Sequence, residues 1–145
     1  MKKIMLKIIG KQLNKEGEQE VVELITEGKY YKKGDATYLI YQETELSGVQ
    51  GCTTKLRITD DIIHMKRFGS ASSEIQFQKG KRFNAHYNTP YGNVEMEVLT
   101  KKIENELNKT EATGFLNIEY DISLSGLVEG RNKLNIEIMN KAKTN

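Results

Sequence analysis

The sequence has few of the residues that mark an exported or membrane protein. Its 145 residues include one cysteine, Cys52, one proline, Pro90, and no tryptophan. A secreted domain of this size usually carries paired cysteines, so a disulfide framework is not expected. Lys7 interrupts the apolar start before it reaches the roughly seven residues of a signal-peptide core. No apolar stretch approaches the roughly 20 residues of a membrane span. These absences predict a cytoplasmic protein.

Residues that carry catalytic or metal chemistry are also scarce. The two histidines, His64 and His86, belong to no metal-ligand spacing such as H-x-E-x-H, and no C-x-x-C is present. Cys52 has no paired histidine motif and is interpreted as a small buried thiol. The chain contains no G-x-S-x-G elbow and no phosphate-binding loop. We therefore expect no metal, no cofactor and no catalytic residue, and the sequence favours a non-enzymatic protein.

Charge of one sign is not concentrated in the sequence. The 22 basic and 20 acidic side chains give a formal net charge of +2, and the signs are interspersed. The densest basic patches, at residues 2–3, 32–33, 79–82 and 101–102, lie next to expected turns. Solvated lysines explain such short patches. From the linear sequence we expect neither nucleic acid nor a membrane as partner.

Strict alternation of apolar and polar residues dominates the second half of the chain. Between residues 115 and 125, five apolar side chains alternate with polar ones: Leu116, Ile118, Tyr120, Ile122 and Leu124. This period of two predicts a strand with one buried and one solvated face. Shorter alternating runs cover residues 74–78, 82–87, 94–98 and 133–138. Content of β-branched and aromatic residues predicts further strands over 3–13, 19–33, 36–46, 50–59 and 61–68.

Short glycine-containing clusters separate these segments, at residues 15–17, 33–35, 79–81 and 129–132 among others. Such regular spacing indicates a meander of about ten strands. Residues 100–110 allow either a short helix or a strand end followed by a loop. Tight turns favour an up-and-down barrel over a Greek-key sandwich, and closure removes unpaired edges. The sequence thus predicts one all-β domain over residues 1–145, a single antiparallel barrel of about 8–10 strands.

Polar side chains on two expected strands provide the candidate site. If residues 36–46 and 61–68 place their alternate side chains inward, a carboxylate and a guanidinium enter the lumen together. One interpretation is an ion pair that fixes strand register and fills the barrel. The other is an anchor for the polar head of a ligand. The candidate ligand-binding residues are Tyr41, Glu43, Arg67, Tyr87 and Tyr120.

Several short motifs carry a resemblance to a known family. They are T-E-G at residues 26–28, Y-x-E at 41–43, R-x-G at 67–69, Y-x-T-P-Y-G at 87–92, and an I-E-Y at 118–120 that follows Gly114. Phe77 and Gly80 fit the strand and turn between them. In this order and spacing the chain resembles the YwiB-like proteins of bacteria, a family of unknown function, with T-E-G as an early turn. The resemblance implies a calycin-like (lipocalin-like) barrel and a cytosolic bacterial protein, and it implies no activity.

Three hypotheses on function follow. The leading one is a non-enzymatic barrel that binds a small, partly apolar ligand in its lumen. The second is an interaction module in which strands with apolar residues on both faces, near the N-terminus, form a homodimer or partner contact around a side-chain-filled barrel. The third is an enzyme with Glu43 as acid or base and Arg67 as electrostatic stabiliser.

Overall fold

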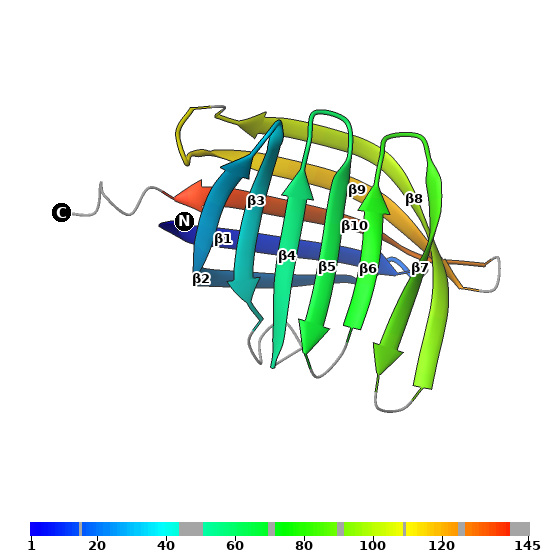
Figure 1. The fold of residues 1–145 in the computed structure, drawn as a ribbon. Helices are drawn as coiled ribbons and strands as arrows, with labels where there is room; N and C mark the ends of the chain where they lie inside the picture. Colours follow the sequence, from blue (N-terminus) through cyan, green and yellow to red (C-terminus); the bar gives the residue numbers. More distant parts are fainter. Residues whose placement is uncertain are drawn as a thin grey trace.

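The fold is a closed antiparallel barrel of ten strands, seen in a computed structural model (Figure 1). The structure describes residues 1–14, 16–43, 51–69, 72–89, 92–108, 110–124 and 127–139, apart from the side chains at 87–89, 94, 124 and 127–129. The strands are β1 (Lys2–Asn14), β2 (Gln19–Lys33), β3 (Ala36–Gln42), β4 (Cys52–Ile58), β5 (Ile63–Gly69), β6 (Ser72–Phe77), β7 (Arg82–Thr89), β8 (Gly92–Leu107), β9 (Gly114–Leu124) and β10 (Leu127–Met139).

Each strand pairs with its neighbours in sequence, and β1 pairs with β10 to close the ring. The predicted all-β, up-and-down barrel is therefore confirmed. Figure 1 shows two walls: β3 to β7 run steeply across the front, and β1, β9 and β10 cross behind them. The long strands β2 and β8 bend from one wall into the other. Within the described residues, no helix is long and apolar enough to cross a membrane.

One of the open local alternatives is settled, and two local expectations were wrong. For residues 100–110 the sequence allowed a short helix or a strand end followed by a loop, and the second holds: strand β8 ends at Leu107. The expected turn at residues 129–132 lies inside β10, where the register shifts between Val128 and Gly130. Thr26-Glu27-Gly28 is not a turn either, because β2 runs unbroken through it. At Gly28 a Cβ atom would lie 2.7 Å from Leu6 Cδ1 and 2.9 Å from the Ile40 carbonyl oxygen, so this glycine serves close packing.

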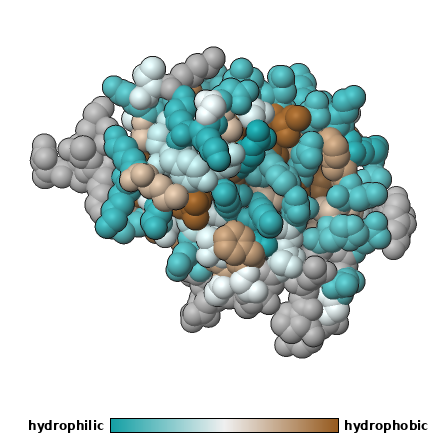
Figure 2. Space-filling model, viewed as in Figure 1, coloured by the Kyte–Doolittle hydropathy of each residue, from teal (hydrophilic) through white to brown (hydrophobic). Residues whose placement is uncertain are grey.

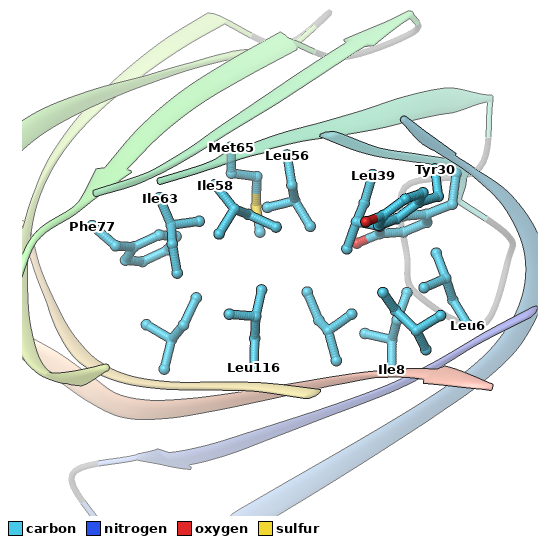
Figure 3. Close-up of a cluster of buried hydrophobic side chains, with 14 of the residues drawn as sticks. Leu6, Ile8, Tyr30, Leu39, Leu56, Ile58, Ile63, Met65, Phe77 and Leu116 are labelled. Carbon is cyan, nitrogen blue, oxygen red and sulfur yellow. The ribbon is translucent and has the colours of Figure 1, made fainter. Parts of the chain in front are cut away.

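The centre of the lumen is filled by apolar side chains from both walls. Figure 3 shows two facing rows of them. The labelled side chains of one row come from β2 to β6, and those of the other row from β1 and β9. Leu6, Leu39, Leu56, Phe77 and Leu116 are completely buried. Alternation in the sequence selects this inward set, and its burial is the main stabilising contribution to the fold.

Strand pairing leaves one stretch of β2 with a single described partner. Residues 19–30 of β2 pair with β1, but pairing with β3 begins only at Gly28. Inward side chains at the start of β2 therefore line the rim of the barrel, not its packed centre. Val22, which points inward, is 38 % exposed there. The lumen is thus more open at the end formed by the start of β2 and the end of β9 than at its centre.

Candidate functional site

A buried ion pair lies inside the barrel wall near this end. Glu43 follows strand β3, and its side chain is only 4 % exposed, whereas that of Arg67 on β5 is 20 % exposed. Arg67 Nη2 donates to Glu43 Oε1 at 3.2 Å. Thr54 of β4 lies between them: its hydroxyl donates to Glu43 Oε1 at 2.7 Å and accepts from Arg67 Nε at 3.3 Å. Three adjacent strands thus contribute one hydrogen-bonded cluster.

Register explains why these residues meet. Thr54 pairs with Tyr41 on one side and with Arg67 on the other, so all three side chains point to the same face. Glu43 extends that face by two residues, and its backbone N–H donates to the carbonyl of Cys52 at 2.8 Å. Gly69 ends β5 with φ +129°, and a Cβ there would lie 2.3 Å from the Gly51 oxygen. This close approach of two backbones holds the end of β5 against the start of β4.

Tyr41 closes the inner side of the cluster. The ring is buried, with 4 % of the residue exposed. Burial, and then the negative charge of Glu43, raise the pKa of the Tyr41 phenol above its ordinary value of 10.0, although Arg67 opposes the shift. Tyr41 is therefore neutral at physiological pH and acts as a hydrogen-bonding group in the cluster.

Tyr120 of β9 packs against the core and lies within the influence of the Arg67 charge. Burial raises the pKa of its phenol, and the positive charge of Arg67 opposes this rise, which places the two groups within electrostatic reach. The Tyr120 ring packs on Phe77 with ring centroids 4.8 Å apart. Tyr120 therefore lies between the packed centre of the lumen and its polar end.

A hollow of about 150 Å³ lies beyond Tyr120 at the rim of the barrel. Its lining includes Gly10, Val22, Tyr120, Asn132 and Leu134. Asn132 is 9 % exposed, and its Nδ2 group has no hydrogen-bond partner. A buried amide without a partner is costly. The hollow thus offers apolar walls and one unused donor.

The structure brings together three of the five candidate residues in one cluster. Tyr41, Glu43 and Arg67 form this cluster, and the charge of Arg67 influences Tyr120, which packs on Phe77. The side chain of Tyr87 lies outside the described residues, although its backbone pairs with Ser73 and Val94. Sequence reasoning missed Thr54, which appears as one more small polar residue on a strand. Its cross-strand position between Tyr41 and Arg67 could have identified it only with the register known.

Other residues considered for chemistry have structural partners. Cys52 is buried and forms no disulfide. His64 Nε2 lies 2.7 Å from Glu74 Oε1 on the outer surface, and His86 is exposed. Within the described part of the chain, no group of three or more His, Cys, Asp or Glu side chains could hold a metal ion.

The fold and this cluster define a class: a closed, ten-stranded antiparallel barrel with an ion pair in its lumen. Residues 6–136 match a family described as a domain of unknown function, DUF1934. The chain belongs to this family, so the resemblance inferred from its motifs is confirmed. The family has no established function.

Two matches with known proteins agree with that assignment. The chain is 32 % identical over 108 residues to the uncharacterised β-barrel protein YwiB of Bacillus subtilis (strain 168), which covers 74 % of this chain and 72 % of that protein. The crystal structure of the Bacillus subtilis ywiB protein superposes with a TM-score of 0.81 and 24 % identity, covering 95 % of this chain and 91 % of that one. This structural likeness supports the fold alone.

Proposed function

We propose that this protein is a non-enzymatic cytoplasmic barrel that binds a small, partly apolar molecule at the polar end of its lumen. The observation that best supports this proposal is the ion pair between Glu43 and Arg67, which is buried inside the barrel. An apolar residue would fill the same space at a lower cost in desolvation free energy. Removing both charges from water is costly, and a hydrophobic pair of similar size is often as stable or more stable. A role in binding accounts for their presence at this end.

Arg67 has hydrogen-bonding capacity to spare. A guanidinium has five N–H donors, and the described contacts use one on Nε and one on Nη2. Its side chain is 20 % exposed, so the remaining donors can meet a ligand that enters from solvent. The ligand accordingly carries a hydrogen-bond acceptor, with a carboxylate as the best geometric match to a planar guanidinium.

Apolar side chains around the cluster suit the rest of such a molecule. Inward residues of β6, β8, β9 and β10 are only partly buried at this end and pack against the core: Ile75, Met96, Tyr120, Ile122 and Leu134. Small-molecule sites combine apolar walls with a few polar groups in this way. The calycin-like character suggested by the sequence points in the same direction by analogy of fold.

Native mass spectrometry tests the proposal first. Protein purified without denaturant is compared with the same sample after unfolding, and we expect a small-molecule mass that is lost on unfolding. The purified protein is then titrated by calorimetry with phenylacetate, a small carboxylate with an apolar ring. Phenylacetamide serves as its uncharged counterpart, and we expect weaker binding of the amide.

Two variants assign the binding to the lumen. Arg67→Met combined with Glu43→Gln removes the ion pair without leaving a buried charge, and we expect loss of binding with the fold retained. Lys66→Met is the matched control, because Lys66 is the neighbouring residue and is exposed on the outer face. Equal binding by the wild type and the double variant, or no binding of either probe at millimolar concentration, contradicts the proposal.

A homodimer is the second candidate function. Val21 and Ile25 lie on the outer face of β2 and are 56 % and 53 % exposed, in the stretch that pairs with β1 but with no described residue of β3. An exposed strand edge with apolar residues favours pairing with another strand. Light scattering combined with size-exclusion chromatography tests it: Val21→Lys with Ile25→Lys is expected to convert a dimer to a monomer. A monomeric wild type excludes this candidate.

A further inference from the structure

The outer face of β1 to β5 gathers basic side chains that the linear sequence scatters. The register places Lys3 next to Lys29, Lys29 next to Ile40, Ile40 next to Lys55, and Lys55 next to Lys66. One row across five strands thus holds four lysines. With a strand spacing of about 4.8 Å, the row spans about 19 Å.

Aromatic rings and an arginine flank the row. Tyr31 and Tyr38 are cross-strand partners on the same face, with ring centroids 4.6 Å apart and planes 6° apart. Lys55 Nζ lies 5.1 Å from the Tyr38 ring centroid, and Arg57 Nε donates to the Tyr38 hydroxyl at 3.2 Å. On the other side of the row, Phe68 of β5 is 43 % exposed.

The lysines of this row have no acidic partner in the described part of the chain. Lys3, Lys29, Lys55 and Lys66 form no described ion pair, in contrast to Lys7, Lys101 and Lys133 elsewhere on the surface. At the end of the row, Glu74 pairs with His64. The positive charge of the row is therefore available to a ligand.

Acidic side chains occupy outward positions of three other strands. Seven lie at outward positions of β8, β9 and β10: Glu95, Glu97, Glu104, Glu106, Glu119, Asp121 and Glu137. Two of them, Glu119 and Asp121, pair with basic side chains of the same strands. Figure 2 shows the front wall from outside, with hydrophilic side chains over most of the surface and isolated apolar ones between them.

We propose that this outer face, defined by Lys3, Lys29, Lys55, Lys66, Arg57 and Phe68, binds single-stranded nucleic acid. The lysines match a chain of phosphates, and exposed aromatic rings stack on bases without regard to sequence. Sheet faces that combine aromatic and basic side chains bind single strands in several common modules. A row of about 19 Å accommodates about four to six nucleotides. The proposal is independent of the lumen site and replaces the expectation of no nucleic-acid partner.

Fluorescence anisotropy with a fluorescein-labelled 16-nucleotide oligouridylate tests it. Neutralising about four phosphates of a single strand predicts that affinity falls about 50-fold between 50 and 200 mM salt. We expect the triple variant Lys29→Glu, Lys55→Glu, Lys66→Glu to bind at least tenfold more weakly at 50 mM salt. The triple variant Lys11→Glu, Lys81→Glu, Lys102→Glu changes the net charge equally at exposed positions outside this face, and we expect at most a threefold loss.

Phe68→Ser separates stacking from charge alone. We expect at least fivefold weaker binding of the oligonucleotide, with an unchanged salt dependence. The proposal is overturned by no binding of the wild type at 100 µM protein and 50 mM salt, or by equal losses in the two triple variants. Binding to vesicles of phosphatidylserine with none to the oligonucleotide also overturns it, and identifies an anionic membrane surface as the partner.

Discussion

The centre and the polar end of the lumen are filled by different kinds of side chain. At the centre, Leu56 and Leu116 from facing walls are completely buried, and their packing needs no hydrogen bonds. At the polar end, Glu43, Thr54 and Arg67 fill the space with a hydrogen-bonded cluster that reaches solvent. The centre stabilises the fold through burial, whereas the polar end keeps charged groups that we propose serve binding.

Truncation of the centre gives the largest expected effect. Leu56→Ala leaves a cavity in a completely buried row, and the free energy of unfolding is expected to fall by about 2–5 kcal/mol. Val22→Ala at the rim, where the side chain is 38 % exposed, is expected to cost less than about 1 kcal/mol. Urea denaturation of both variants measures the difference, and equal losses would show that the two regions are packed alike.

Breaking the ion pair on one side gives the next effect. Glu43→Gln leaves the Arg67 guanidinium partly buried without its carboxylate, and we expect a loss of about 1–3 kcal/mol in the free energy of unfolding. Adding Arg67→Met is expected to restore most of this loss. Urea denaturation of the single and double variants measures the coupling. A double variant less stable than the single one would mean that the pair holds the fold together.

The stability of the protein at alkaline pH tests the contribution of the buried tyrosines. Burial raises the pKa of Tyr41 and Tyr120 above 10.0, so the unfolded chain loses these protons at lower pH than the folded chain does. Their contribution to stability is fully present below pH 10 and is lost as pH rises above it toward the raised values. Thermal unfolding between pH 9 and 11.5 should show a falling melting temperature, with a shallower fall in Tyr41→Phe. The same slope in both proteins would contradict this role of Tyr41.

An exposed ion pair gives the smallest effect. Arg82 Nη1 lies 2.7 Å from Glu97 Oε1, and both side chains are largely solvated. Arg82→Ala is expected to change the free energy of unfolding by less than about 1 kcal/mol. Urea denaturation measures it beside Glu43→Gln, and a loss as large as that of the buried pair would remove the distinction between lumen and surface.

The sequence predicted the barrel well because alternation reports directly which side chains point inward. Leu116 and Ile118 are buried as expected, and the ring closes through neighbours in sequence. Glycine predicted turns less well. Gly28 and Gly130 lie inside strands, where their small size permits close backbone packing. The local sequence does not distinguish this role from a turn.

The alternation of inward and outward side chains predicted part of the candidate site. The residues that it missed depend on strand register, which the sequence does not give. Glu43 and Arg67 could be paired because alternation put both on inward faces. Thr54 and the unpartnered amide of Asn132 escaped notice, because only the alignment of neighbouring strands shows what lies beside them. The lysine row on the outer face escaped for the same reason, since Lys29, Lys55 and Lys66 belong to three separate strands.

An NMR titration tests the central claim, that the polar end of the lumen is a ligand site, most directly. Protein labelled with ¹⁵N and with ¹³C in its methyl groups is titrated with phenylacetate. We predict saturable shifts in the Thr54 methyl, the Arg67 Nε–H and the backbone of Tyr120, with the Leu6 and Leu56 methyl groups unchanged. Saturable shifts confined to residues outside the lumen, or no shifts at millimolar phenylacetate, would contradict the claim.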